Sequence, residues 1–359
     1  SIAGPIPVLP HRRIQLAARH SAQVTKAPGK SRFCDAAYRK MWGTDRELGY
    51  DIETMGSTAS RVGGYLLALL VSGVVNEAVA ADVTPVKATI QRHLDLQYDG
   101  GKRAVPTADG QRSLDLYLPA HGGATAPPLF IYIHGGAWLS GDKRQYAPLG
   151  LALSAQGVAV AVINYRLSDG SVDGVRHPAH AQDAALAVAF LRKNAATYGY
   201  DANRIFVGGH SAGAHMSALL AYDGALLSAV GEKPESLRGF VGLEGIYDLN
   251  ELVRRFPSYR VDFLQAAFGS DETNWQKASP QHLVLSGIGM HRRPWLLVHA
   301  RTDELVDLEQ SRHFSKALEK QSIPVRFVSP ERGTHFGVIG ELATPQSPLG
   351  QQLLAFLKS

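Results

Sequence analysis

The sequence predicts an α/β fold in which a mostly parallel, twisted sheet carries helices on both faces. From residue 112 onward, short strand-like runs alternate with helix-like segments, and this alternation is typical of parallel strands joined by helical crossovers. Several strand-like runs are continuously apolar, as expected for strands buried on both faces. The 359 residues are 45% hydrophobic, which is enough for a large buried core and excludes a wholly disordered chain.

The first half of the folded region begins with an alternating run. Residues 112–118 alternate polar and apolar side chains, which indicates a half-buried strand, whereas 129–133 is continuously apolar and β-rich. Farther along, Ala, Leu and Phe recur at helical spacing over 179–199. We predict strands at residues 112–118, 129–133, 158–164 and 205–207, and helices at 146–156, 179–199 and 212–222.

The second half continues the same alternation with one interruption. We predict strands at residues 239–245, 295–299 and 324–328, and helices at 308–321 and 348–358. The interruption is residues 246–294, which insert 49 residues between two predicted strands. Structureless loops of that length are uncommon, so we expect a small cap or an elaborated substrate loop there. Its many charged residues differ from the broad apolar lid that long acyl chains require.

The first 80 residues have a different character. Residues 1–54 lack sustained periodicity, and we interpret them as an unstructured leader or an artefact. Residues 55–80 have the three-part pattern of a signal peptide: a polar stretch, the apolar run 64–75, and small residues before an expected cleavage after Ala80. A periplasmic or secreted protein is therefore expected.

Two alternatives to export follow from the same apolar run. The run of 12 residues is shorter than the roughly 20 that a membrane-spanning helix needs, so no stable membrane span is expected. A membrane anchor and a buried helix of a cytosolic protein remain the competing interpretations. In the favoured interpretation, residues 81–359 form the single folded domain.

Charge and cysteine content exclude several classes of site. Ten of the 37 Lys and Arg residues lie in residues 1–80, and the rest of the chain carries 27 basic and 26 acidic residues. Such a balance offers no basic stripe for a phosphate backbone, so nucleic-acid binding is not expected. Cys34 is the only cysteine, which excludes an intramolecular disulfide and a cysteine-ligated metal site.

The strongest motif is G-x-S-x-G at residues 209–213, between a predicted strand and a predicted helix. In that context the small residues allow a tight, strained turn that exposes the hydroxyl of Ser211 above a helix N-terminus. A serine hydroxyl needs a base and an orienting acid before it can act as a nucleophile. Both are expected at the ends of downstream strands.

Asp303 and His335 are the candidate acid and base. Asp303 follows the strand at 295–299, and His335 lies in a loop after the strand at 324–328. Catalytic groups of open α/β sheets collect at such carboxyl ends. Glu304 and Asp307 are the rival acids. Among the other histidines, those inside predicted strands and helices are interpreted as structural: His215, His299 and His313.

A glycine pair after the strand at 129–133 predicts an oxyanion hole. Residues 134–138 read HGGAW, and the backbone N–H groups of Gly135 and Gly136 can join that of Ala212. We expect Trp138 to line the acyl pocket or to pack in the core. His210, next to Ser211, is expected to form a pocket wall or to fill the turn. We expect neither a metal nor a cofactor.

These motifs resemble those of α/β-hydrolase esterases over about residues 112–340. Within that superfamily the chain is similar to hormone-sensitive-lipase-like and bacterial feruloyl-esterase-like carboxylesterases, including the segments 163–167 (INYRL) and 201–204. Those groups often have a third glycine where this chain has Ala137. Residues 209–215 and 245–248 are also similar to kynurenine formamidases. The resemblance implies an α/β-hydrolase fold and a Ser-His-Asp triad, and does not name the substrate.

This pattern is compatible with three functions. The leading hypothesis is a serine carboxylesterase acting on a small-molecule ester with a short acyl or an aryl group. An arylformamidase that hydrolyses N-formylkynurenine needs the same machinery. A non-catalytic binding protein of the same fold is the third hypothesis, although such a protein is expected to lose a triad member or an oxyanion glycine, and this chain retains them all.

Overall fold

The computed structural model describes residues 90–100, 111–120 and 125–359. The expected leader at 1–54 and signal peptide at 55–80 lie outside the described residues. Eight described strands form one sheet in the order β1-β2-β4-β3-β5-β6-β7-β8. They are β1 Gln91–Gln97, β2 Ser113–Leu118, β3 Leu129–Ile133, β4 Ala159–Ile163, β5 Ile205–His210, β6 Gly239–Leu243, β7 Trp295–Val298 and β8 Val325–Val328.

The sheet is mostly parallel, as the alternation of strands and helices predicts. Strands β3 to β8 pair in parallel, whereas β2 pairs antiparallel with both β1 and β4 at one edge. Because parallel strands end at the same edge, the loops that follow β3, β5, β7 and β8 meet there. The predicted fold class is confirmed.

Helices cover both faces of the sheet. The helices are α2 Ala147–Ser154, α3 Ala179–Lys193, α4 Ala195–Tyr198, α5 Ala212–Tyr222, α6 Gly224–Ser228, α7 Leu249–Arg255, α8 Gln265–Phe268, α9 Glu272–Lys277, α10 Pro280–Ser286, α11 Glu309–Lys320, α12 Gly337–Leu342 and α13 Pro348–Leu357. Short turns of other helix types are η2 Lys143–Tyr146, η3 Pro234–Ser236 and η4 Arg260–Leu264.

Each face of the sheet has its own hydrophobic cluster. Helices α3, α5 and α11 contribute side chains to the larger cluster together with Ile131 of β3. Helices α2, α12 and α13 pack against the other face, where Phe130 and Tyr132 of the same strand point. Successive residues of β3 thus enter opposite cores, which explains why the strand is continuously apolar in sequence.

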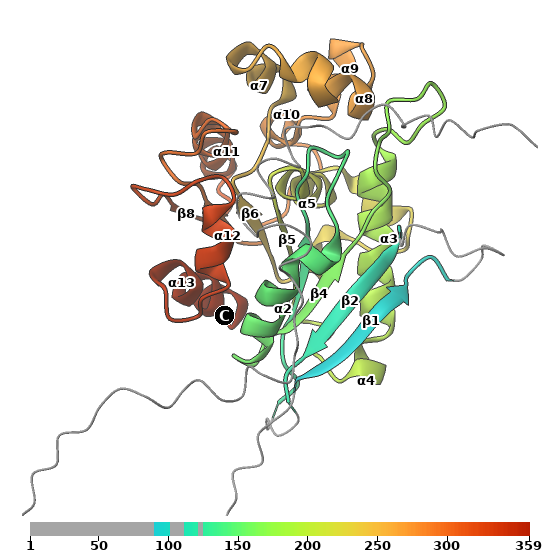
Figure 1. Cartoon of the computed structure of the whole chain (residues 1–359), viewed down its shortest axis with the longest axis vertical. Coiled ribbons are helices and arrows are strands. Elements are labelled where there is room, and N and C mark those ends of the chain that lie inside the picture. The colour runs from blue at the N-terminus through green and yellow to red at the C-terminus, as the bar shows by residue number, and fades with distance from the viewer. Residues whose placement is uncertain (1–89, 101–110, 121–124) are drawn as a thin grey trace, which may run out of the picture.

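The structure corrects some predicted elements. The helix predicted at 179–199 is two helices, α3 and α4, which meet at Asn194. Strand β5 extends past 207, because Gly208 and Gly209 continue the ladder with β3 and β6. The segment 246–294 contains α7, η4, α8, α9 and α10, and Figure 1 shows α7, α8 and α9 grouped at one end of the molecule.

Candidate active site

Ser211 occupies a strained turn between β5 and α5. Its backbone has φ 54° and ψ −116°, a left-handed φ that side-chain-bearing residues rarely adopt, and it is the N-cap of α5. The Ser211 N–H donates to the carbonyl oxygen of Leu243 at 2.8 Å, which ties the turn to β6. The strain presents the hydroxyl at the edge of the sheet, with the residue 7% exposed.

The glycines of the motif have steric reasons in this fold. A Cβ at Gly213 would overlap the backbone of Ile133 and His134 in the loop after β3. A Cβ at Gly209 would overlap the carbonyl oxygen of Ile133 and the backbone of Gly213. The chain therefore turns at Ser211 only because both positions lack a side chain.

Asp303 and His335 are in direct contact. His335 Nδ1 lies 2.8 Å from Asp303 Oδ2, and both side chains are almost completely buried. Because a carboxylate only accepts, Nδ1 carries the proton and Nε2 is left as an acceptor. The other carboxylate oxygen, Oδ1, accepts the backbone N–H groups of Leu305 at 2.8 Å and Val306 at 3.0 Å. Asp303 is thus held rigidly toward the imidazole.

The pKa of Asp303 reflects these contacts. Burial by itself raises the pKa of a carboxyl group, but the charge of His335 and the hydrogen bonds from His299 and His335 outweigh it. The pKa of Asp303 is therefore held well below its ordinary value. A carboxylate that stays ionised in this position can stabilise an imidazolium beside it.

The rival acids and bases have other partners. Glu304 is exposed, and its carboxylate accepts the backbone N–H of His335 at 3.2 Å rather than the ring. Asp307 accepts Arg255 Nε at 2.7 Å. His299 is buried at the end of β7 and bonds to Ser311 and Val306, and His313 on α11 pairs with Glu251. His299 Nε2 also lies 3.3 Å from Asp303 Oδ2, but of the two histidines that contact Asp303 only His335 lines the cavity.

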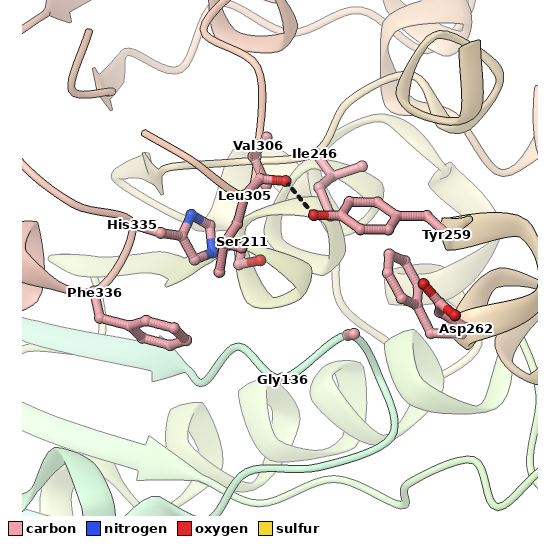
Figure 2. A pocket seen from close by; sticks show the side chains of 11 residues that line it. Gly136, Ser211, Ile246, Tyr259, Asp262, Leu305, Val306, His335 and Phe336 are labelled. Carbon is pink, nitrogen blue, oxygen red and sulfur yellow. Dashed lines mark hydrogen bonds between the residues drawn. The ribbon is translucent and has the colours of Figure 1, made fainter. Parts of the chain in front are cut away.

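Ser211 and His335 line the same cavity, which is open to solvent. Figure 2 shows the two side chains within it, and a hydrogen bond of 3.0 Å from the Tyr259 hydroxyl to the Leu305 carbonyl oxygen closes one wall. Among the described residues, the lining consists of Gly136, Ala137, Ser211, Ile246, Tyr259, Asp262, Phe263, Leu305, Val306, His335 and Phe336.

The loop after β3 presents its backbone to the cavity. Gly136 lines the cavity with φ 120°, and the following Ala137 lines it with φ 53°. Gly135 lies farther back, where an added Cβ would meet the His210 ring and the Ser211 side chain. Ala137 was not among the donors predicted from the sequence. The signal that could have found it is its place where related esterases often have a third glycine.

His134 fixes this loop from behind. Burial lowers the pKa of His134 to about 4, so the ring is neutral near pH 7. Its Nδ1 lies 2.7 Å from the carbonyl oxygen of Gly135, which requires the proton on Nδ1. The first residue of the HGGAW segment therefore has a positional role that its sequence did not reveal.

Trp138 and His210 lie beside the site rather than on the cavity wall. Trp138 is fully buried and meets the rings of His215 and Phe268 edge to face. His210 is fully buried, and its Nε2 lies 2.8 Å from the carbonyl oxygen of His335. Burial and the charge of His335 hold the pKa of His210 well below its ordinary value. The His210 ring is therefore neutral and donates its Nε2 proton to the His335 backbone.

One buried group of side chains has ligand-like atoms close together. An oxygen of Glu244, an oxygen of Asp303 and a ring nitrogen of His299 lie within 4.8 Å of one another. However, His299 Nε2 also lies 3.0 Å from the carbonyl oxygen of Val306, an acceptor that requires Nε2 to carry a proton. A protonated nitrogen cannot ligate a metal, so this chemistry is that of a hydrogen-bonded cluster.

With this geometry in place, comparison with known proteins identifies the family. The BD-FAE family model matches residues 114–318, more than half of the chain. The chain belongs to the BD-FAE family. Its fold is that of the α/β-hydrolases, which confirms the resemblance inferred from the motifs.

Curated relatives include esterases and a formamidase. The esterase LipC of Mycobacterium tuberculosis is 30% identical over 254 residues, covering 68% of this chain and 60% of LipC. The isoprenylcysteine alpha-carbonyl methylesterase ICME of Arabidopsis thaliana is 29% identical, covering 65% of this chain and 56% of its own length. The kynurenine formamidase AvaC of Aspergillus versicolor is 31% identical over 54% of this chain and 76% of its own. The chain spans less than two thirds of the methylesterases and LipC.

Solved structures share the fold at lower identity. Esterase B from Lactobacillus Rhamnosis has a TM-score of 0.62 at 21% identity, covering 74% of this chain and 85% of its own. A truncated carbohydrate esterase from gut microbiota has a TM-score of 0.61 at 20% identity, covering 76% of this chain and 97% of its own.

Within the described residues, we find no helix that is both long and apolar enough to cross a membrane.

Proposed function

We propose that the protein is a serine carboxylesterase that hydrolyses short-chain acyl or aryl esters through an acyl-enzyme intermediate. In this mechanism Ser211 attacks the acyl carbon, His335 takes and returns the proton, and Asp303 orients the imidazole. The observation that carries the proposal is the 2.8 Å contact between His335 and Asp303 at a cavity that Ser211 also lines. Esterases among the relatives support the same reaction class.

Each step follows from the hydrogen-bond geometry. Because the Nδ1–H of His335 is hydrogen-bonded to Asp303, the ring offers Nε2 as the base for the Ser211 hydroxyl. The same nitrogen then protonates the leaving alcohol, and water attacks the acyl-enzyme with His335 again as the base. In the first half-reaction the Ser211 oxygen bonds to the acyl carbon and the alcohol oxygen leaves with the proton from His335. In the second, the water oxygen bonds to the acyl carbon and the Ser211 oxygen leaves and regains its proton from His335.

Candidate backbone donors lie on two segments near Ser211. Ala212 is the first residue of α5, and Gly136 and Ala137 of the loop after β3 line the cavity. We propose Ala212 and Gly136 as oxyanion donors and add Ala137, which lines the cavity. Gly135 was also predicted as a donor and remains a candidate, although it lies against His210 rather than on the cavity wall.

The lining supports a small acyl or aryl group. Ile246, Phe263, Val306 and Phe336 present apolar side chains, and the polar groups are few. Asp262 at the wall disfavours a long apolar chain that would pass its carboxylate. Residues of the 246–294 segment form part of this lining, so we propose that the segment acts as a small cap that limits substrate length.

A second candidate function is arylformamidase. The 31% identity to a kynurenine formamidase supports it, because a formamidase uses the same nucleophile and base. In that reaction a formyl group replaces the acyl group and an aromatic amine leaves. The two functions therefore differ in the substrate pocket rather than in the triad.

One substrate series tests both candidates. Wild-type protein and Ser211→Ala are assayed with aryl esters from acetyl to long-chain acyl groups and with N-formylkynurenine. Each methylene that fits adds about 0.8 kcal/mol, so efficiency should rise to an optimum between acetyl and butyryl and then fall. Ser211→Ala should lose nearly all turnover, and a serine-directed phosphonate should label Ser211 once in the wild type. A long-chain optimum, or label on another serine, contradicts the proposal; a formylkynurenine rate far above every ester favours the formamidase.

We also propose that the protein is exported. The support is the sequence pattern of residues 55–80, with its 12-residue apolar run and small residues before position 81. Expression from Met55 in a bacterial host should yield a product that begins near Ala81 outside the cytoplasm. Mass spectrometry of the fractions decides the question, and uncleaved protein in the cytoplasm or the membrane counts against export.

A further inference from the structure

Glu244 is a buried acid that the proposed mechanism does not use. It directly follows β6, is fully buried, and has a left-handed φ of 48°. Its backbone N–H donates to the Val298 carbonyl oxygen at 2.9 Å, which fixes it beside the end of β7. A strained backbone at a fully buried acid indicates a functional constraint on this position.

One oxygen of the Glu244 carboxyl group accepts a hydrogen bond, and the other has no hydrogen-bond partner in the described structure. Oε1 accepts the backbone N–H of Ala300 at 3.1 Å. Oε2 lies 3.2 Å from His299 Nε2, but it has no hydrogen bond of good geometry in the described structure. The single Nε2 proton of His299 also faces the Val306 carbonyl oxygen at 3.0 Å and Asp303 Oδ2 at 3.3 Å. One proton cannot satisfy all of these acceptors.

The two carboxyl groups cannot both be ionised. Atoms of Glu244 and Asp303 lie within 4.8 Å of one another, and both side chains have no exposed surface. Like charges at this separation in a buried site leave one carboxyl protonated. Asp303 accepts two backbone N–H groups and the His335 ring, whereas Glu244 accepts one backbone N–H. The donor set therefore assigns the charge to Asp303 and the proton to Glu244.

The electrostatics agree with this assignment. Burial raises the pKa of Glu244 to about 11, and the hydrogen bond and charge of Asp303 add to the rise. The other titratable groups around it are His299, Asp303 and Glu304 from the segment after β7, His335 from the loop after β8, and Tyr247. A neutral Glu244 can direct its O–H toward the Asp303 carboxylate.

We propose that Glu244 is a positioning residue that stays protonated beside Asp303 and donates a hydrogen bond to the carboxylate that orients His335. The donated bond disperses the charge of Asp303 and so limits how strongly His335 holds a proton. This inference rests on the proposed function, in which His335 is the base. Its closing test includes a measurement that does not need turnover.

The decisive variant is Glu244→Gln. An amide has the size of a protonated carboxyl group and can donate the same hydrogen bond, so the acid limb of the kcat/KM profile should stay within about 0.3 pH unit of the wild type. If Glu244 were ionised, the same change would remove a negative charge near His335. The acid limb would then move to lower pH by about one unit or more, which overturns the proposal.

Glu244→Met is the matched variant that removes the hydrogen-bond donor. Its similar length fills the space, but the thioether cannot donate to Asp303. The acid limb should move to higher pH by about one unit. The ratio of kcat/KM at pH 6 to kcat/KM at pH 8 should therefore be up to about tenfold lower in this variant than in the wild type. A merely structural residue would change stability without moving this limb, and an unmoved limb contradicts the proposal. Glu304→Gln, which removes an exposed carboxylate next to His335, calibrates a true loss of charge with a small shift to lower pH.

Two measurements remain valid without ester turnover. NMR titration of ¹⁵N-labelled histidines, with the His335 signal assigned by its loss in His335→Gln, should give the same midpoint in wild type and Glu244→Gln even if every ester assay fails. Infrared spectra of wild-type protein at pH 8 should contain the carbonyl band of a protonated carboxyl group. Absence of that band overturns the proposal whether or not the variants fold.

Discussion

At the end of β7, three acidic side chains lie within five residues, and their surroundings differ. Asp303 has a fully buried side chain against the His335 ring, whereas Glu304 is exposed and Asp307 pairs with Arg255. Coulomb interactions and hydrogen bonds act strongly only where water is excluded. The orienting role should therefore belong to Asp303 alone.

Asp303→Asn tests this assignment. The amide cannot hold the imidazole in the correct tautomer or stabilise its charged form, so kcat/KM should fall by about 10³ to 10⁴-fold. Asp307→Asn and Glu304→Gln should cost less than about tenfold, because each removes an exposed or half-exposed charge that solvent already screens. Steady-state kinetics on a short aryl ester measures all three, and a larger loss in Glu304→Gln would shift the assignment by one residue.

At the residue scale, the sequence points to a candidate residue where the local sequence carries the chemistry. Ser211 has a turn motif, and Asp303 and His335 follow predicted strands, so each has a signal within a few residues. Glu244 has no such signal, and the signal of Ala137 is only its place after the glycine pair. The importance of Glu244 comes from Asp303, 59 positions away, and that of Ala137 comes from its left-handed backbone beside the cavity. Such features arise only when distant loops meet.

At the scale of elements, the junction of β5 and α5 depends on contacts with the loop after β3. Residues Gly208 and Gly209 extend β5 against β3, and Gly213 lets the first turn of α5 approach the backbone of Ile133 and His134. The same approach holds the loop after β3 close to Ser211. Packing of the turn and geometry of the proposed site are therefore coupled.

Gly213→Ala tests this coupling. The new Cβ would overlap backbone rather than a flexible side chain, so the free energy of unfolding should fall by about 1–3 kcal/mol and turnover should fall with it. Gly224→Ala, at the start of α6, is the matched control, since its Cβ would meet no atom within 4 Å. The control should change stability by less than about 1 kcal/mol. Equal stability of both variants in urea unfolding contradicts the argument.

Element prediction from sequence was best for buried, regular segments. The strand at 129–133 and the helix at 212–222 have the bounds that their apolar patterns predict. Strand β1 was missed because it is an antiparallel edge strand with mostly exposed residues, which weakens the hydrophobic pattern. The short helices within 246–294 were also missed, since each has fewer than eight residues and depends on tertiary contacts.

At the scale of the whole molecule, neutral histidines are distributed through the buried interior. His134 supports the loop after β3, His180 lies in α3 with its Nε2 2.9 Å from Ser168 Oγ, and His215 lies in α5 with its Nε2 2.9 Å from the Ala278 carbonyl oxygen. Burial lowers the pKa of His134 to about 4 and those of His180 and His215 to about 3. The native state thus resists protonation at positions in several elements.

This distribution predicts loss of stability in mild acid. The unfolded chain binds protons on these histidines below about pH 6.5, whereas the native chain does not until pH 3 to 4. The contribution of these neutral histidines to the free energy of unfolding is therefore fully present above pH 7 and falls as the pH decreases below 6.5. Each histidine contributes a loss of up to about 2 kcal/mol at pH 5. Asp142, whose pKa is lowered to about 2 by hydrogen bonds from Arg144 that outweigh its burial, adds a loss only below about pH 4.

The slope of unfolding free energy between pH 7 and pH 5 measures this effect. His215→Gln removes one of these titrating groups, so its slope should be shallower than that of the wild type by up to about 1.4 kcal/mol per pH unit, whatever its stability at pH 7. His313→Gln, at a position that is 41% exposed on α11, is the comparison for the same substitution outside the core. Identical slopes for His215→Gln and the wild type would mean that His215 is already protonated in the native state at pH 5, contrary to its burial in the core.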